Sequence, residues 1–202
     1  MAAITTLLFD LGGVVLSNAW DHSQRAAVAA HFGLDPAALE ARNAQWMAPL
    51  ETGQISLDEY LVRVVFDKPR AFTPADLSAF IRSCSQPMPE TLALLGELAS
   101  AGRLRLATLN NEGRDLNQHR IARFGLKRYF SVFCSSCYLG ARKPEPEIYR
   151  RALGILQADP GECLFIDDRE ENLAGAQAVG IEGLHFTSAA NLRAAFGQRG
   201  LL

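Results

Sequence analysis

The chain begins with an apolar run that ends on a single carboxylate. Residues 4–9 read Ile-Thr-Thr-Leu-Leu-Phe, and Asp10, Gly12 and Gly13 follow closely. Short apolar runs bounded by glycine are typical of a parallel strand that is buried on both faces. Asp10 would then lie at the carboxyl end of the strand, where open α/β sheets place their active sites. Because an unpaired buried carboxylate costs roughly several kcal/mol, later parts of the chain are expected to supply positive charge there.

Residues 18–87 show helical patterns and no strand pattern. Four helix starts are predicted from residues that favour N-caps, namely Asp21, Asp35 before Pro36, Ser56 with Glu59 three residues on, and Thr73 before Pro74. The segment 86–89, Gln-Pro-Met-Pro, then predicts a hinge, because its two prolines cannot continue a helix. The sequence therefore predicts an all-helical insertion after the first strand.

From Pro89 onward, helices and strands alternate. Helices are predicted over residues 89–101, 112–123, 145–154 and 173–179, followed by a last amphipathic helix, and strands over 103–109, 130–134, 163–166 and 181–186. Strands that alternate with helices form right-handed βαβ units and a parallel sheet. We predict an α/β domain made of residues 1–17 and 88–202, interrupted by the helical segment 18–87.

The composition excludes several classes of protein. A net charge of −2 argues against the basic face that nucleic-acid binding requires. No apolar segment is long and uncharged enough to span a bilayer, and the apolar start lacks the basic residues of a signal peptide. We expect a cytoplasmic protein without nucleic-acid or membrane partners, and the sequence leaves its oligomeric state open.

The cysteines fit a reducing compartment. We expect four reduced thiols, with a redox or metal role for the spaced pair Cys134 and Cys137 as a minor alternative. The four are Cys84, Cys134, Cys137 and Cys163.

Polar residues follow the predicted strands and should converge at one edge of the sheet. They are Asn110 and Asn111 after the second strand, Lys143 in a later loop, and Asp167 and Asp168 after the fourth strand, with Asn172 nearby. Taken singly, Asp167 and Asp168 would cap the next helix, and Lys143 would be an exposed loop lysine. Only their convergence on Asp10 indicates a site.

This set of side chains predicts phosphoryl chemistry. Clustered carboxylates repel one another unless a cation lies between them, and short oxygen ligands without His or Cys suit Mg²⁺. Magnesium beside Lys143 would bind a phosphoryl dianion. Asp10 would act as nucleophile and form an aspartyl-phosphate that water hydrolyses. Asn110 and Asn111 would donate hydrogen bonds to the phosphoryl oxygens of a small phosphorylated metabolite.

Together these motifs resemble the haloacid dehalogenase-like hydrolases. The resemblance rests on residues 9–15, Phe-Asp-Leu-Gly-Gly-Val-Val, on 109–111, Leu-Asn-Asn, on Lys143-Pro144, and on 165–168, Phe-Ile-Asp-Asp, with Asn172. It implies a Rossmann-like core with an α-helical cap inserted after the first strand.

The resemblance also implies a phosphatase with a defined set of site residues. Mg²⁺ would be held by Asp10, the carbonyl of Gly12 and Asp168, with Asp167 and Asn172 behind these ligands. Lys143 would neutralise Asp10 and the phosphoryl group. The Asp-Leu-Gly opening is similar to a subgroup of sugar-phosphate phosphatases that includes glucose-1-phosphate phosphatases.

The sequence departs from the family pattern at two positions. Phosphatases of the family carry a second aspartate two residues after the nucleophile as general acid and base, but here that residue is Gly12. Losing a positioned proton donor typically costs about 10²–10⁴-fold in rate. A cap residue would have to replace it, and Asp21, His22 and Glu51 are unranked candidates. The second departure is Asn110, which replaces a Ser or Thr.

Two rival functions stay open. One is a metal-free dehalogenase of the same superfamily, against which the pair Asp167 and Asp168 argues. The other is a non-catalytic phosphate-binding or regulatory protein that lost its acid at Gly12; retention of Asp10, Lys143 and Asp168 argues against it. Four arginines in and after the predicted 112–123 helix are expected to form a solvated face: Arg114, Arg120, Arg123 and Arg128.

Overall fold

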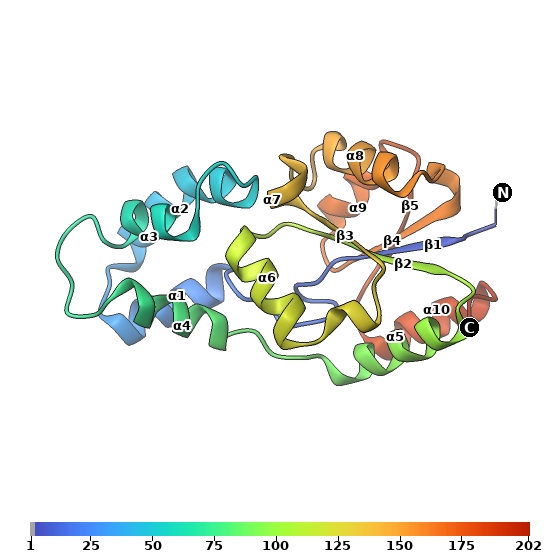
Figure 1. Cartoon of the computed structure of the whole chain (residues 1–202), viewed down its shortest axis with the longest axis horizontal. Helices are drawn as coiled ribbons and strands as arrows, with labels where there is room; N and C mark the ends of the chain where they lie inside the picture. Colours follow the sequence, from blue (N-terminus) through green and yellow to red (C-terminus); the bar gives the residue numbers. More distant parts are fainter. Residues whose placement is uncertain (1–2) are drawn as a thin grey trace.

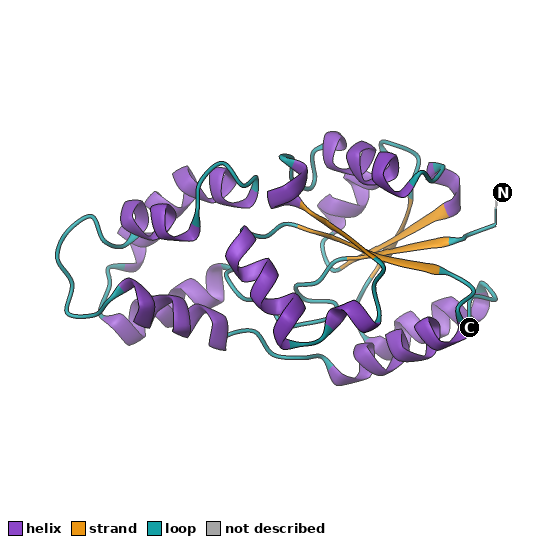
Figure 2. Cartoon of the chain, viewed as in Figure 1, coloured by secondary structure: helices purple, strands orange, loops and turns teal. Residues whose placement is uncertain are grey.

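The computed structural model describes residues 3–202 and consists of a sheet-containing half and a helical half (Figures 1 and 2). Five strands pair in parallel in the order β3-β2-β1-β4-β5. They are β1 (Thr6–Phe9), β2 (Arg105–Asn110), β3 (Val132–Ser135), β4 (Cys163–Asp167) and β5 (Glu182–His185). The predicted α/β fold with a parallel sheet is confirmed.

The first strand lies at the centre of this sheet. β1 pairs with β2 on one side and β4 on the other, and all its residues are buried. Figure 1 shows α5 (Pro89–Ala101) and α10 (Ala189–Gln198) on one face, and α8 (Pro146–Leu156) and α9 (Glu170–Gln177) on the other. Each face has its own apolar cluster, the first around Phe9 and Phe196 and the second around Tyr149 and Phe165. Asp10 is thereby fixed between two packed layers.

The helical half contains α1 (His22–Phe32), α2 (Pro36–Glu51), α3 (Leu57–Val64) and α4 (Pro74–Ser83), and we call these four helices the cap. Their N-caps are Asp21, Asp35, Ser56 and Thr73, as predicted, and each side chain accepts from a backbone N–H in the first turn. Local capping signals determined these starts, because they act within the first turn of each helix.

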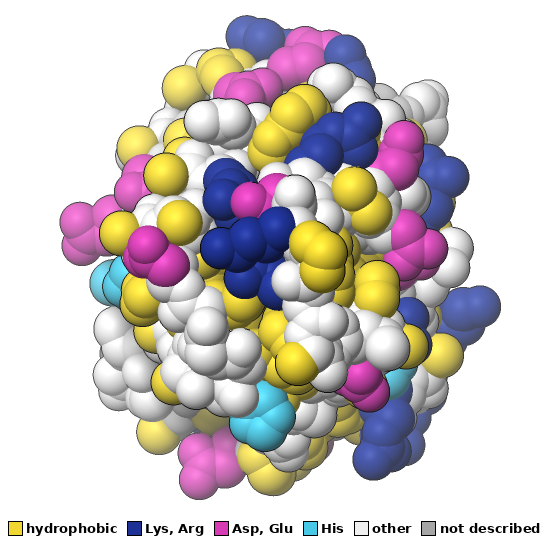
Figure 3. Space-filling model, turned by 90° about the vertical axis from the view of Figure 1, so that its left-hand side faces the viewer, with side chains coloured by type: hydrophobic (Ala, Val, Ile, Leu, Met, Phe, Trp, Pro, Cys, Tyr) yellow, Lys and Arg dark blue, Asp and Glu magenta, His cyan; other side chains and the backbone are white. Residues whose placement is uncertain are grey.

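The cap has an apolar core of its own, around Tyr60, Leu61 and Leu77, which Leu116 from the other half joins. Figure 3 views the molecule from the cap end and shows Lys and Arg side chains gathered beside acidic ones. At this end Asp67 lies 2.7 Å from Arg42 and 3.0 Å from Arg70. The charges of the cap surface are therefore partly paired.

Two chain segments connect the halves, and they run side by side. The Ser17 N–H donates to the Gln86 carbonyl at 2.8 Å, and the Met88 N–H donates to the Val15 carbonyl at 3.1 Å. Arg120 of α6 (Arg114–Arg123) donates to the Ser17 carbonyl at 2.8 Å. The predicted hinge is thus paired with the segment that follows β1 and anchored to α6.

Several details differ from the sequence prediction. A short helix, α7 (Ser136–Leu139), follows β3 directly and was not predicted, because four residues show no helical period. α9 begins three residues earlier than expected, because its first turn is acidic and not apolar. Two 3₁₀ turns, η1 (Leu126–Arg128) and η2 (Pro160–Glu162), precede β3 and β4.

Two further expectations concern side chains and membranes. The prediction that Arg120 is solvated is wrong: it is 3% exposed and lies 2.5 Å from a Glu112 oxygen. All four cysteines are free thiols, and Cys134, Cys137 and Cys163 are buried. Within residues 3–202, no helix combines the length and apolar character needed to cross a membrane.

Candidate active site

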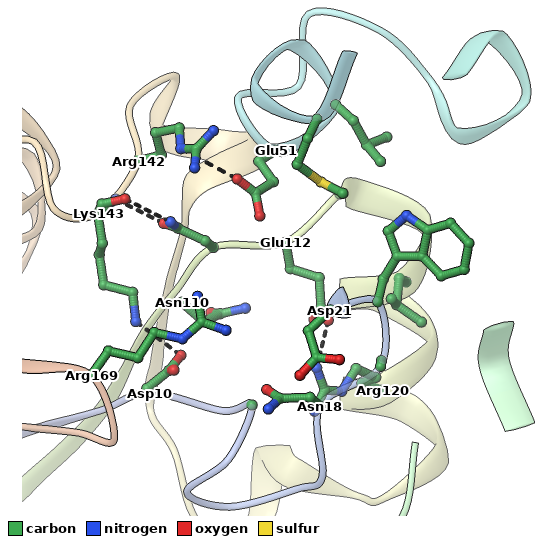
Figure 4. Close-up of a pocket in the computed structure, with 18 of the residues that line it drawn as sticks. Asp10, Asn18, Asp21, Glu51, Asn110, Glu112, Arg120, Arg142, Lys143 and Arg169 are labelled. Atoms are coloured by element: carbon green, nitrogen blue, oxygen red, sulfur yellow. Dashed lines mark hydrogen bonds and ion pairs between the residues drawn. The ribbon is translucent and has the colours of Figure 1, made fainter. Parts of the chain in front are cut away.

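Lys143 is the centre of the charged cluster at the carboxyl ends of the strands. Its Nζ lies 3.0 Å from Asp10 Oδ1 and 2.6 Å from Asp167 Oδ2. Lys143 is 2% exposed and Asp10 8% exposed, so the cluster is almost entirely removed from water. Lys143 therefore supplies the positive charge that Asp10 was expected to receive from a later part of the chain (Figure 4).

Asn111 holds the backbone of Lys143. Its Nδ2 donates to the Lys143 carbonyl at 2.9 Å, and its Oδ1 accepts from the Lys143 N–H at 2.8 Å. This reciprocal pair joins the end of β2 to the loop before α8. The side chain of Asn111 is therefore engaged with Lys143, although we expected it to donate to a phosphoryl group.

Asp167 is held by the start of α9. Asn172 Nδ2 donates to both carboxylate oxygens, at 2.9 and 3.1 Å, and the Arg169 N–H donates at 2.9 Å. Tyr149 in turn donates from its hydroxyl to the Asn172 carbonyl at 2.6 Å. With these donors and Lys143, a fully buried carboxylate has all its acceptors occupied. Asp167 and Asn172 thus lie behind Lys143.

Asn110 is part of a second buried network. Its Nδ2 donates to Asn117 Oδ1 at 3.2 Å, and Ser135 Oγ donates to Asn110 Oδ1 at 3.1 Å. An amide nitrogen carries two hydrogens, so one remains for another acceptor. Asn110 also lines the pocket described below. Asn117 and Ser135 were not predicted, because nothing in their local sequence marks them.

Three carboxylates cluster here, and within the described part of the chain Asp10 and Asp168 are the two with oxygens still free to share a cation. Oxygens of Asp10, Asp167 and Asp168 lie within 4.8 Å of one another. Asp168 Oδ1 is buried and has no hydrogen-bond partner among residues 3–202. Gly13 has a φ of +78°, and a Cβ there would lie 2.3 Å from Asp168 Oδ2, so glycine makes room for this carboxylate. An orphaned carboxylate oxygen beside two other carboxylates fits Mg²⁺, which prefers hard oxygen ligands.

The proton affinities in the cluster agree with this arrangement. Burial raises the pKa of Asp10 to about 6, with Lys143 opposing the shift and Asp167 and Asp168 adding to it. Burial, followed by the negative charge of Asp167, also raises the pKa of Asp168. Lys143 has a raised pKa as well, because the attraction of Asp10 and Asp167 outweighs the opposing effect of burial. The site therefore keeps the positive charge of Lys143, and further positive charge beside Asp10 and Asp168 would stabilise their ionised forms.

The cluster opens into a pocket between the cap and the sheet. The cavity holds about 180 Å³, with Asp10, Asn110 and Lys143 on the side that we call its floor. The opposite side, which we call its roof, is apolar. It is formed by Trp20, Met47, Leu50, Leu57, Ile81 and Leu116. The pocket is thus charged where the strands end and apolar where the cap covers it.

Charged side chains around the pocket include several that sequence analysis did not identify. Arg142 and Arg169 line it, and they are the chain neighbours of Lys143 and Asp168. Their positions beside motif residues could have marked them. Glu112 also lines it and pairs with Arg120. Glu112 follows Asn111 directly, but its partner is eight residues away, in the next helix.

The three candidates for the missing acid separate clearly. His22 is exposed and lies 3.3 Å from Glu40, away from the pocket lining. Asp21 lines the pocket, but its Oδ1 caps α1 through the N–H groups of Ser23 and Gln24. Only Glu51 lines the pocket without a capping role.

The position that the missing aspartate would occupy is filled. A Cβ placed on Gly12 would lie 2.6 Å from Asn18 Oδ1, and both residues line the pocket. Asn18 therefore occupies the space into which a side chain at residue 12 would project. Because Gly12 has no positive φ, a larger residue there requires only that Asn18 move.

Comparison with known proteins decides the family. The profile of the haloacid dehalogenase-like hydrolases matches residues 4–180. The chain belongs to this family. The superfamily resemblance drawn from the four motifs is therefore confirmed.

Individual relatives and solved structures also resemble this haloacid dehalogenase-like hydrolase. A sesquiterpene phosphatase from Aspergillus oryzae is 34% identical over 52% of this chain and 53% of its own length. A phosphoglycolate phosphatase from Yersinia pestis is 29% identical over 88% of this chain and 78% of its own length. A haloacid dehalogenase family enzyme from Bacteroides thetaiotaomicron, crystallised as a magnesium complex, covers 96% of this chain and 99% of its own, with 24% identity and a TM-score of 0.83.

Some of these relatives are matched over only part of their length. The chain spans about half the length of the sesquiterpene phosphatase. It is also 43% identical over 67 residues to a chloroplast flavin mononucleotide hydrolase from Arabidopsis thaliana, of which it spans about a quarter. The Bacteroides structure, at its level of identity, supports the fold alone.

Proposed function

We propose that this hydrolase is a Mg²⁺-dependent phosphatase of a small phosphorylated metabolite, such as a sugar phosphate. The observation that carries the proposal is the buried cluster of Asp10, Lys143 and Asp168 on the floor of the pocket. The relatives add support, because the Aspergillus and Yersinia pestis proteins are both named phosphatases, and the alignment with the second covers most of this chain.

Each floor residue has a proposed task. Asp10 attacks the phosphorus atom, which breaks the bond to the leaving oxygen and leaves an aspartyl-phosphate. Lys143 neutralises negative charge on Asp10 and on the phosphoryl group, and Asn110 donates its remaining N–H. Asn111, Asp167 and Asn172 hold Lys143 in position.

Asp10, the carbonyl of Gly12 and Asp168 would hold Mg²⁺. When bound, the ion would supply further positive charge for the phosphoryl oxygens. This assignment is supported by the orphaned Asp168 oxygen and by the room that Gly13 leaves for that carboxylate. Metal binding has a readout without catalysis: Mg²⁺ should raise the Tm of the wild-type protein, and Asp168→Asn should abolish that rise.

The domain assignment is also part of the proposal. Residues 18–87 would form a cap over a core of residues 1–17 and 88–202, and would enclose the substrate. A separate cap is supported by its own apolar cluster and by the paired connections at Ser17 and Gln86.

The test is an activity panel. Purified protein is assayed with and without Mg²⁺ on sugar phosphates, nucleotides, aryl phosphates and 2-haloacids, alongside Asp10→Asn. We expect phosphate release that requires both the metal and Asp10. Halide release without metal would support the dehalogenase alternative, and no release from any phosphate ester would overturn the proposal.

A further inference from the structure

We propose that Glu51 of the cap is the general acid and base that Gly12 lacks, an inference that rests on the proposed phosphatase function. Gly12 offers no proton, and Asn18 fills the space beside it. A phosphatase whose substrate has a poor leaving group still requires a proton donor in the same pocket. The structure presents one carboxyl group from the opposite wall.

Glu51 is held firmly against the sheet-containing half. It is the last residue of α2, and its carbonyl accepts from Ser136 Oγ at 2.6 Å. Two residues later, a Cβ on Gly53 would lie 2.2 Å from the Cys137 carbonyl, so the chain passes closely over α7. The carboxyl group is therefore positioned by contacts with the same half that carries Asp10, although it belongs to the cap.

The Glu51 side chain is half-buried, and its carboxyl group is incompletely paired. Its side chain is 16% exposed, and Oε2 lies 3.3 Å from Arg142 Nε. That oxygen receives no hydrogen bond from residues 3–202. Figure 4 shows the carboxyl group between Arg142 and the interior of the pocket, on the side opposite Asp10. A buried group whose oxygen lacks a donor is suited to hold a proton of its own.

The surroundings of Glu51 favour its protonated form. Burial raises its pKa, while the positive charges of Arg142, Lys143 and Arg169 oppose the rise and Glu112 adds to it. Arg142 is in ion-pair contact without an aligned hydrogen bond, so it orients the carboxyl group and does not fix its charge. A general acid works best when its pKa approaches the working pH.

Besides Asp10 and Glu51, four carboxyl groups line the pocket, and two of them, Asp115 and Glu171, are exposed. Asp21 caps α1 and accepts from Ser23 N–H at 2.9 Å. Glu112 accepts from Arg120 at 2.5 Å in a pair that is 3% and 6% exposed. Burial raises the pKa of Glu112 as well, but the bonded Arg120 opposes that rise and occupies one of its oxygens. Compared with Asp21 and Glu112, Glu51 is the residue whose carboxyl group accepts no hydrogen bond from residues 3–202.

In the proposed reaction, Glu51 gives a proton in the first step and regains one in the second. As Asp10 attacks phosphorus, the P–O bond to the substrate breaks and the leaving oxygen takes the proton of Glu51, giving an alcohol and a Glu51 carboxylate. A water then gives its proton to Glu51 while its oxygen bonds to phosphorus. The P–O bond to Asp10 breaks, inorganic phosphate leaves, and both residues return to their starting states.

Leaving-group dependence tests this assignment. 4-Nitrophenyl phosphate has a leaving group that departs without a proton, whereas a simple alkyl phosphate requires one. Glu51→Gln should lower kcat/KM on the alkyl phosphate by roughly 10²–10³-fold, because general acid catalysis is lost. On 4-nitrophenyl phosphate kcat/KM should fall by less than about fivefold, because this leaving group departs without a proton.

Two further variants separate catalysis from cap docking. Arg142→Gln breaks the same ion pair but keeps the acid, so its loss on the alkyl phosphate should be much smaller than that of Glu51→Gln. Gly12→Asp added to Glu51→Gln should restore alkyl phosphate hydrolysis, with Asn18 moving aside.

Several results would overturn the assignment. Equal losses on both substrates in Glu51→Gln would mean that Glu51 only docks the cap, and a leaving-group effect in Asp21→Asn would move the acid to Asp21. Failure of the phosphatase function itself is recognised separately. In that case wild-type protein would release no phosphate from 4-nitrophenyl phosphate, or the release would persist in Asp10→Asn.

Discussion

The floor and the roof of the pocket are built on opposite principles. On the floor, Lys143 contacts two carboxylates, and its backbone is fixed by Asn111. The roof is a set of apolar side chains, mostly from the cap, beside the incompletely paired carboxyl group of Glu51. Under the proposed function, the networked floor would preorganise charge at the phosphoryl group, and the apolar roof would select the leaving group by shape. Changes to the floor should therefore alter the chemical step, and changes to the roof should alter substrate choice.

The largest effect is expected on the floor, from Asp10→Asn. Removing the nucleophile should reduce kcat by at least about 10⁴-fold on every phosphate ester, whatever its leaving group. Steady-state kinetics on an alkyl and an aryl phosphate measure this, and circular dichroism checks the fold. Activity within tenfold of wild type would place the nucleophile elsewhere.

Lys143→Met should follow on the same side of the pocket. It leaves Asp10 and Asp167 without their shared cation, which should cost about 3–5 kcal/mol of unfolding free energy and about 10²–10³-fold in kcat. Urea unfolding and kinetics measure the two effects. Lys127→Met, at an exposed position, is the matched control and should change neither. A similar small effect in both variants would contradict the buried-pair geometry.

The raised pKa of Asp10 makes the floor sensitive to pH. Because its pKa rises from 3.8 to about 6 on folding, the unfolded chain loses this proton first as pH increases. The wild-type protein, kept metal-free with EDTA, should therefore lose about 2–3 kcal/mol of stability between pH 4 and 7 from this group. Asp10→Asn should lack that contribution, so the difference between the two should grow with pH in urea unfolding. A difference that is constant or shrinks with pH would show that the carboxyl group is not destabilised by burial.

The smallest expected effect comes from the roof. Met47→Ala removes apolar surface from the pocket wall and should raise KM about tenfold on substrates with an apolar body, with kcat little changed. The Mg²⁺-dependent rise in Tm should stay as in wild type. An equal loss in kcat would mean that the roof contributes to the chemical step, and the contrast with the floor would fail.

The same contrast separates what the sequence predicted from what it could not. The sheet, the four cap helices and the convergence of Asp10, Lys143 and Asp168 follow from strand ends and N-cap signals, which are local. The roof, by contrast, is made by tertiary contacts between the cap and α6.

Side-chain pairing was the other unpredicted feature. The buried pair of Arg120 and Glu112 joins two segments of the chain, so composition placed Arg120 wrongly on the surface. Asn111 lines the pocket, but the sequence could not show that its amide would also bond to the backbone of Lys143.

An oxygen-18 experiment tests the central claim most directly. A single turnover of an alkyl phosphate with enzyme in excess and Mg²⁺, run in oxygen-18 water, is followed by mass spectrometry of the released phosphate and of the peptide containing Asp10. Water attacking phosphorus of an aspartyl-phosphate places the label in phosphate and none in the peptide, and Asp10→Asn should give no turnover. Label in the Asp10 carboxyl group would show attack at carbon, the route of an alkyl ester intermediate, and turnover by Asp10→Asn would show that no covalent intermediate forms on this residue.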